Sequence, residues 1–108
     1  MLRIITLNLN GIRSACTKGL LDVLAAQQAD FLCVQELKAQ DPDLRPEMRA
    51  PAGMRGWFHA AEKKGYSGVG IYSRHTPDRV VEGLGIPAID AESRFLQLDF
   101  GKLSVVSL

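Results

Sequence analysis

The fold is decided by the stretch Leu2-Arg3-Ile4-Ile5-Thr6-Leu7-Asn8-Leu9-Asn10-Gly11. Residues 2–9 are almost continuously apolar and β-branched, which predicts a strand buried on both faces, and the asparagine and glycine after them predict a turn. Apolar residues then recur every three or four positions over residues 14–28, which indicates an amphipathic helix with Ser14 as its N-cap. Gly19 is a weak point of this helix, costing about 1 kcal/mol relative to alanine. A second apolar run, residues 31–35, predicts another buried strand.

A strand, a helix and a second strand therefore occupy residues 2–36. Such a unit is almost always a right-handed crossover between parallel strands, so both strands end at the same edge of the sheet. Open α/β sheets bind their ligands at that edge. Asn8 and Glu36 both lie at these strand ends, and we expect them to be close together.

The rest of the chain predicts a loop followed by antiparallel strands. Prolines and glycines crowd residues 39–56, which indicates a loop with one helical turn near residues 44–49. Turn signals then separate strand-like segments at residues 57–62, 68–73, 79–83, 95–100 and 103–108. A parallel start followed by hairpins predicts an α/β (α+β) fold with a mixed sheet. The last segment has no polar tail, so we expect a longer domain cut after Leu108; the alternative is a short protein ending on an edge strand.

The composition is that of an ordinary folded chain, since 46% of the 108 residues are hydrophobic and 23% are charged. These values argue against collagen and disordered chains. Two cysteines, Cys16 and Cys33, make no disulfide framework, and we expect them to be buried and reduced. No stretch resembles a signal peptide or a membrane span, so we expect a cytoplasmic protein with no membrane partner. The net charge of +1 neither indicates nor excludes a nucleic-acid partner.

Two polar residues at the strand ends could carry chemistry. Glu36 closes an apolar strand, where a carboxylate is costly unless it finds a partner, and Mg²⁺ or Mn²⁺ prefers carboxylate oxygens. The alternative is a solvent-facing Glu36 paired with Lys38. Asn8 could hold a metal-bound water, a phosphate oxygen or a catalytic carboxylate, or it is simply a turn residue before Gly11.

A glycine-rich segment, Gly65-Tyr66-Ser67-Gly68-Val69-Gly70, is the second candidate. It has neither the spacing nor the following helix of a dinucleotide site. Its backbone amides, together with Lys63, Lys64 and Tyr66, could grip a phosphodiester backbone. The alternative is a hairpin turn whose glycines allow close packing. Arg13 and Lys18 flank the first turn, and they could contact phosphates too or belong to a solvated face.

Other conspicuous side chains predict structural roles. His59 and His75 have no partner at the spacing of a metal site or a catalytic triad. Trp57 and Phe58 are expected in the core rather than in a platform for base stacking.

Three segments, taken together and in order, resemble the exonuclease III family of abasic-site (AP) endonucleases, within the endonuclease/exonuclease/phosphatase superfamily. They are Leu7-Asn8-Leu9-Asn10-Gly11-Ile12-Arg13-Ser14, Cys33-Val34-Gln35-Glu36-Leu37-Lys38 and Gly65-Tyr66-Ser67-Gly68-Val69-Gly70-Ile71-Tyr72-Ser73-Arg74. Glu92-Ser93-Arg94-Phe95 is similar to the start of the family's next strand. The resemblance covers nearly all of residues 1–108, which correspond to the N-terminal part of that family's catalytic domain.

The resemblance implies a two-sheet β-sandwich flanked by helices, each sheet mixed in strand direction. Glu36 would be the ligand of a catalytic Mg²⁺ or Mn²⁺, and Asn8 would help to hold the metal or the catalytic carboxylate. Asn10 occupies a position that is often acidic in the family, which argues against a second metal role there. The residues that match the family's DNA-gripping loops are Arg13, Ser14, Lys18, Gly65 and Tyr66, with Lys63 and Lys64 beside them.

The implied activity is that of a DNA-repair phosphodiesterase that cuts 5′ to abasic sites and trims 3′ ends. Its partner would be double-stranded DNA with abasic or 3′-blocked sites, and we expect a monomer when the domain is complete. The family's later motifs, a catalytic Tyr, an Asp-x-Asn pair and a Ser-Asp-His end, do not occur in these residues, so we expect this stretch alone to be inactive. The alternatives are a non-catalytic DNA-binding remnant and a phosphatase or sphingomyelinase branch of the superfamily.

Overall fold

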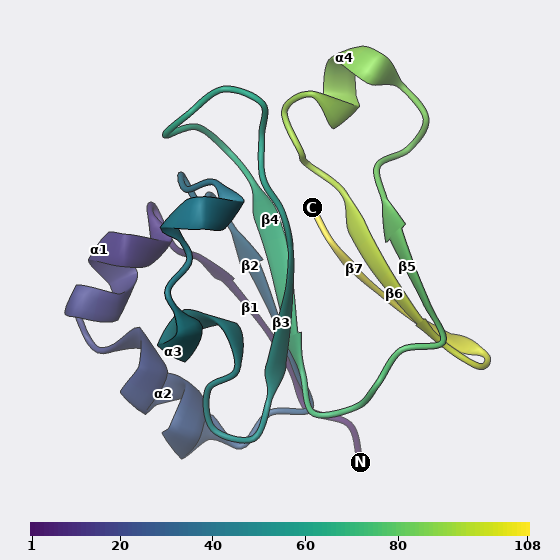
Figure 1. The fold of residues 1–108 in the computed structure, drawn as a ribbon. Coiled ribbons are helices and arrows are strands. Elements are labelled where there is room, and N and C mark those ends of the chain that lie inside the picture. The colour runs from purple at the N-terminus through teal and green to yellow at the C-terminus, as the bar shows by residue number, and fades with distance from the viewer.

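Two β-sheets and a layer of helices make up the computed structural model, which describes residues 1–108 (Figure 1). The first sheet has the strand order β1-β2-β4-β3, and the second has the order β5-β6-β7. The elements in chain order are β1 (Ile4–Asn8), α1 (Ile12–Thr17), α2 (Leu20–Gln27), β2 (Phe31–Gln35), the 3₁₀ turn η1 (Asp41–Asp43), α3 (Pro46–Arg49), β3 (Arg55–His59), β4 (Val69–Ser73), β5 (Arg79–Glu82), α4 (Pro87–Asp90), β6 (Leu96–Phe100) and β7 (Leu103–Ser107). No helix is long and apolar enough to cross a membrane.

The crossover predicted for the first 36 residues is present. β1 pairs with β2 in parallel, from Ile4 opposite Phe31 to Asn8 opposite Gln35. β4 is antiparallel to both β2 and β3, so the first sheet is mixed, as predicted. β1 and β2 therefore end at one edge, and their ends carry the candidate site.

Two details of the first 28 residues differ from the prediction. β1 is not buried on both faces: Ile4 and Leu7 are exposed, because β1 is an edge strand with no neighbour on its far side. The single helix over residues 14–28 is two helices, because the backbone turns at Gly19, where φ is +100°. Ser14 is not an N-cap; it lies inside α1, whose N-cap is Gly11.

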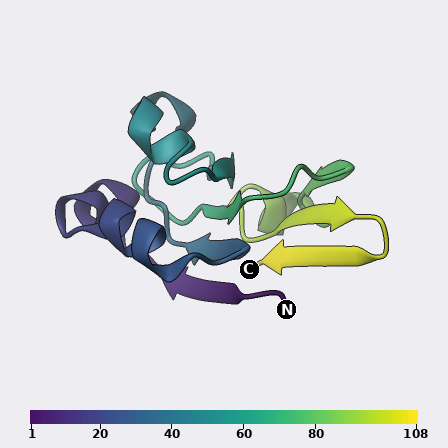
Figure 2. The same cartoon turned by 90° about the horizontal axis from the view of Figure 1, so that it is seen from below.

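The core has two parts, one on each side of the first sheet. Between this sheet and the helices lies a cluster of twelve buried residues that includes Val34, Met48 and Tyr72. Between the two sheets lies a cluster of seven buried residues that includes Ile71 and Leu96. Figure 2 shows α1, α2 and α3 on one side of the first sheet and the second sheet on the other. The molecule is therefore a β-sandwich with helices on one face only.

Hydrogen bonds from the last strand join the two sheets close to the site. The Ser107 hydroxyl donates to the Val34 carbonyl at 2.9 Å, and the Gln35 side chain donates to the Ser107 hydroxyl at 3.3 Å. The end of β7 thus lies against the end of β2. The short helix α4 was not predicted; it connects β5 to β6.

Candidate active site

Asn8 and Glu36 meet at the ends of the two parallel strands, as the crossover predicts. Asn8 is the last residue of β1, and Glu36 follows directly on β2. Asn8 Nδ2 donates a hydrogen bond of 2.5 Å to Glu36 Oε2, while Asn8 Oδ1 accepts one of 2.9 Å from the Asn10 amide. These two contacts determine the orientation of the Asn8 side-chain amide, since exchanging its nitrogen and oxygen would place Oδ1 next to the Glu36 carboxylate. Asn8 therefore orients the Glu36 carboxylate.

The backbone at Glu36 is strained and tightly held. Its φ of +52° lies in the left-handed region, which costs a residue other than glycine about 1 kcal/mol or more. The Gly11 amide donates to the Glu36 carbonyl at 2.8 Å, and the Leu37 amide donates to the Gly68 carbonyl at 3.1 Å. The loop after β1 and the glycine-rich loop before β4 thus clamp this turn from two sides. The same left-handed backbone occurs at Gln28 and Ala52, away from the groove, so by itself it marks a tight turn.

Two adjoining polar cavities open at Glu36, and we call them together the Glu36 groove. One, of about 310 Å³, is lined by Asn8, Gln35, Glu36, Ser67, Gly68, Val69, Arg94 and Leu108. The other, of about 380 Å³, is lined by Glu36, Lys38, Gly65, Tyr66, Ser67 and Arg94. The shared residues are Glu36, Ser67 and Arg94. Both strand ends and the glycine-rich loop therefore face one polar depression.

Lys38 forms an ion pair with Glu36, which is the alternative contact that the sequence also indicated. Its Nζ is 3.7 Å from Glu36 Oε1 and donates a 2.6 Å hydrogen bond to Asn10 Oδ1. Both charged side chains are about 40% exposed, so their pairing contributes little to stability. Arg13 Nη2 donates to the Lys38 carbonyl at 3.0 Å, which makes Arg13 a brace for this turn.

A second ionic group links the glycine-rich loop to the start of β6. The Tyr66 hydroxyl donates to Glu92 Oε1 at 2.7 Å, and Arg94 Nη2 donates to the Tyr66 hydroxyl at 3.0 Å and to Glu92 Oε1 at 3.2 Å. The Lys63 ammonium and the Arg94 guanidinium lie 5.4 Å and 5.7 Å from the Tyr66 ring centre. The Tyr66 hydrogen bond, followed by the one from Arg94, lowers the pKa of Glu92 below its usual range. Hydrogen bonds to Tyr66 and Glu92 raise the pKa of Arg94.

The structure brings together only part of the predicted DNA-contacting set. Gly65 and Tyr66 line the Glu36 groove. Lys18 lines a separate hollow of about 210 Å³ next to Asn8, on the side of α2. Ser14 and Lys64 are exposed and line neither cavity of the groove. These five assignments remain predictions.

Arg94 was missed as a site residue. Its tetrapeptide was noted as part of the family resemblance, but no role was attached to it. Arg94 is the only residue of the second sheet's β5–β6 connection to reach the groove, and it lines both cavities. The sequence feature that could have identified Arg94 was its place in Glu92-Ser93-Arg94-Phe95, a segment of the family resemblance that leads into a predicted strand.

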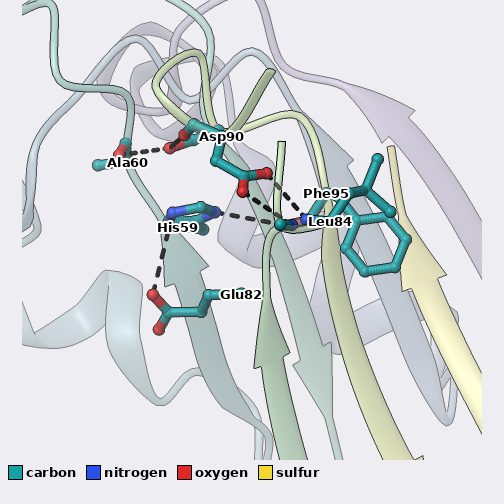
Figure 3. A network of polar contacts seen from close by, with 8 residues as sticks. His59, Ala60, Glu82, Leu84, Asp90 and Phe95 are labelled. Atoms are coloured by element: carbon teal, nitrogen blue, oxygen red, sulfur yellow. Dashed lines mark hydrogen bonds and ion pairs between the residues drawn. The ribbon is translucent and has the colours of Figure 1, made fainter. Parts of the chain in front are cut away.

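Both histidines, with Asp90 and Asp30, have structural contacts outside the groove. In Figure 3, Asp90 accepts the amides of Leu84 and Gly85 at 2.8 and 3.0 Å, and the His59 ring contacts the Phe95 carbonyl at 3.3 Å. Hence His59 joins β3 to the second sheet. His75 contacts Asp30 Oδ1 at 3.0 Å, at the other end of the strands.

The groove suits a hard divalent cation, with Glu36 as the one carboxylate donor. Mg²⁺ keeps several waters and needs only one or two carboxylates from the protein. No three His, Cys, Asp or Glu side chains are placed so that they could hold a metal ion together. The residues present therefore fit one ligand of a metal site rather than a complete cage.

Comparison with known proteins identifies the family of this chain. Residues 5–108 match the Endonuclease/Exonuclease/phosphatase family. The chain is 34% identical to an exodeoxyribonuclease of Bacillus subtilis over 99% of its own length and 42% of that protein's, and 28% identical to a DNA-(apurinic or apyrimidinic site) endonuclease of Dictyostelium discoideum over 98% and 29%.

Solved structures agree with this match. An AP endonuclease from Archaeoglobus fulgidus superposes with a TM-score of 0.83 at 29% identity, over 98% of this chain and 40% of that one. The 3′ phosphatase NExo from Neisseria, bound to a product DNA hairpin, gives 0.79 at 26% identity, over 98% and 40%. This chain thus spans less than half the length of these relatives. The match of the family model over residues 5–108 makes the chain a member of the Endonuclease/Exonuclease/phosphatase family.

Proposed function

We propose that this chain supplies the N-terminal part of the active site of a metal-dependent DNA-repair phosphodiesterase. Its reaction would be the hydrolysis of DNA 5′ to abasic sites and the trimming of 3′ ends. The observation that carries the proposal is the Asn8–Glu36 pair, which lies at two parallel strand ends and opens into a polar groove. The names of the relatives, an exodeoxyribonuclease and AP endonucleases, support this substrate class.

Glu36 would hold the metal ion, Mg²⁺ or Mn²⁺. Its Oε2 accepts the Asn8 amide, while Oε1 has no hydrogen-bond donor and lies 3.7 Å from Lys38 Nζ. Asn8 keeps the carboxylate turned toward the groove and is thus a positioning residue. A bound divalent cation would polarise the phosphate and stabilise the leaving oxygen.

The substrate would be double-stranded DNA with an abasic or 3′-blocked site. Gly65 and Tyr66, which line the groove, would contact its backbone, with Lys63 over the Tyr66 ring. Removal of a 3′ phosphate is a related hydrolysis, and the likeness to a 3′ phosphatase from Neisseria makes it the second candidate. Cleavage needs the later motifs of the family, so these 108 residues alone should not turn over either substrate.

A titration with Mn²⁺ followed by NMR tests the role of Glu36. Paramagnetic Mn²⁺ should broaden the amide signals of Asn8, Glu36 and Gly68 first, because these residues surround the Glu36 groove. The Glu36→Gln variant should lose this broadening. Glu47→Gln is the matched control, since Glu47 is an exposed carboxylate on α3 that is paired with Arg45.

Equal broadening in the native chain and in Glu36→Gln would overturn the metal assignment. An assay on a duplex with an abasic site completes the test. No Mg²⁺-dependent cleavage is expected from the native chain. Cleavage that Glu36→Gln abolished would show that these residues suffice for catalysis, against our expectation.

A further inference from the structure

Gln35 joins the end of the first sheet that carries the site to the last strand of the second sheet. It is the last residue of β2 and comes directly before Glu36. Its Nε2 donates to the Thr6 hydroxyl on β1 at 3.0 Å and to the Ser107 hydroxyl on β7 at 3.3 Å. Both hydrogens of the amide nitrogen are therefore used within the protein.

The contacts of Ser107 determine the orientation of the Gln35 amide. The Ser107 hydroxyl has a single hydrogen, which it donates to the Val34 carbonyl at 2.9 Å. Its oxygen can therefore only accept from Gln35, and this requires Nε2 rather than Oε1 at that position. Oε1 has no donor in the protein, and it is open to solvent, because no side-chain oxygen that is shut off from solvent lacks a partner. The amide oxygen of Gln35 is thus a free acceptor held in a fixed direction.

Ser67 provides a second oxygen without a protein partner. Only 6% of this residue is exposed, and it lines both cavities of the Glu36 groove. Its backbone is anchored, since its carbonyl accepts the Lys38 amide at 2.8 Å. A largely buried hydroxyl costs stability unless water or a ligand satisfies it. Because no side-chain oxygen shut off from solvent lacks a partner, the Ser67 hydroxyl is open to the groove.

The first cavity of the groove, of about 310 Å³, thus brings together oxygens that need a donor. It is lined by Gln35 and Ser67 together with Glu36, whose Oε1 accepts no hydrogen bond in the protein. Its one cationic side chain, Arg94, is paired with Glu92. A phosphate would present further acceptor oxygens to Gln35 and Glu36. A hydrated divalent cation instead presents the hydrogens of its waters, and Mg²⁺ keeps several waters when it binds a protein.

We propose that Gln35 Oε1 and Ser67 Oγ accept hydrogen bonds from the waters that hydrate the divalent cation on Glu36. Both are positioning residues in this scheme, because they orient the waters and make no direct bond to the cation. The inference rests on the proposed function and deepens it. It also gives the second sheet a part in holding the cation, since Ser107 fixes the direction of the Gln35 amide.

Binding of Mn²⁺ to the full 108-residue chain tests the proposal, with the EPR signal of free Mn²⁺ as the readout. Gln35→Met keeps the length of the side chain but removes the acceptor oxygen, so it should weaken Mn²⁺ binding about tenfold. Ser67→Ala removes a single hydroxyl and should weaken binding about threefold. Gln97→Met is the matched control, because Gln97 on β6 is also partly buried but donates to Asp99 and lines neither cavity.

Two further measurements separate the positioning of waters from a merely structural role. Water-proton relaxation reports how many waters bound Mn²⁺ carries, and this number should be the same in Gln35→Met as in the native chain. Thr6→Val removes one partner of the Gln35 amide and leaves the Ser107 contact, so its Mn²⁺ affinity should stay within about twofold of the native value. Circular dichroism verifies that each variant is folded; if Gln35→Met is not, Ser67→Ala decides the test.

Each contrary result has a distinct meaning. If Gln35→Met and Ser67→Ala bind Mn²⁺ as tightly as Gln97→Met while Glu36→Gln does not, the inference is wrong and the proposed function stands. If Thr6→Val loses as much affinity as Gln35→Met, Gln35 acts only by tying the strands together, and its contact with the waters is refuted. An additional water on Mn²⁺ in Gln35→Met would make Gln35 a direct ligand, against the proposal. If the native chain and Glu36→Gln bind Mn²⁺ alike, the proposed function fails at this site, and the inference fails with it.

Discussion

The two sheets of this protein differ in what covers their outer faces. The four-stranded sheet carries α1, α2 and α3 on one face and the second sheet on the other, so β4 is buried along its whole length. The three-stranded sheet has the first sheet on its inner face and no element on its outer face (Figure 1). Val106, which pairs with Gln97 on that outer face, is exposed. The first sheet therefore has a core of its own, while the second depends on the first for nearly all of its burial.

The sharpest test of this contrast compares a buried residue with an exposed one. Ile71 on β4 is fully buried between the sheets, whereas Val106 on β7 is 38% exposed. Ile71→Ala should lower the free energy of unfolding by about 3 kcal/mol, because it leaves a cavity where both sheets meet. Val106→Ala should change it by less than about 0.5 kcal/mol. Urea denaturation followed by Trp57 fluorescence measures both; similar losses would mean that the outer face of β7 is covered.

A smaller effect is expected at the connection that supports the second sheet. Gly83 has a φ of +89°, and a Cβ there would lie 2.6 Å from the Asp90 carboxyl carbon. Gly83→Ala should therefore cost about 2 kcal/mol, because the left-handed backbone is strained and the Asp90 contacts must shift. Gly101→Ala, at a φ of +59° with open space around it, should cost about 1 kcal/mol. Thermal unfolding compares the two, and an equal cost would show that Asp90 does not brace the second sheet.

A further modest effect at neutral pH is expected on the helical side of the first sheet. The buried Tyr72 hydroxyl donates to the Met48 carbonyl at 2.6 Å and so ties β4 to α3. Tyr72→Phe should cost about 1 kcal/mol, since it leaves that carbonyl without its donor.

The same side chain gives the molecule an alkaline limit. Burial, and then the charge on Cys16, raises the pKa of Tyr72 above its ordinary value near 10. Above about pH 10 the unfolded chain loses this proton while the native chain keeps it, so stability falls as pH rises. The urea midpoint of the native chain should be lower at pH 10.5 than at pH 7. The decrease should be smaller for Tyr72→Phe. Tyr66→Phe should keep the full alkaline loss, since exposed Tyr66 is not in the core.

Much of the first sheet could be predicted from local patterns. The change from a strand period to a helix period, together with the handedness of crossovers, led to parallel strands and to the Asn8–Glu36 pair. The exposure of β1 could not be predicted, because an apolar sequence is typical both of an edge strand and of a strand with neighbours on both sides. The break at Gly19 was recognised as a weak point, but the tertiary packing that turns it into a boundary was not visible.

The second sheet's share of the site could not be predicted for a related reason. Arg94 lines the Glu36 groove only because β6 and β7 pack on β2 and β4, and no local sequence pattern shows which residue then faces the groove. Likewise, Arg13 was expected as a DNA contact, and its bond to the Lys38 carbonyl became visible only in three dimensions.

Position 36 holds a residue that the backbone conformation there does not favour. A glutamate at a φ of +52° strains the backbone, whereas glycine or asparagine would relax it and would leave the buried core untouched. Drift under selection for folding alone would therefore replace Glu36 early and would conserve Ile71 and Tyr72. A descendant that had kept the fold but lost its chemistry would be recognised by a glycine or an asparagine at this one position.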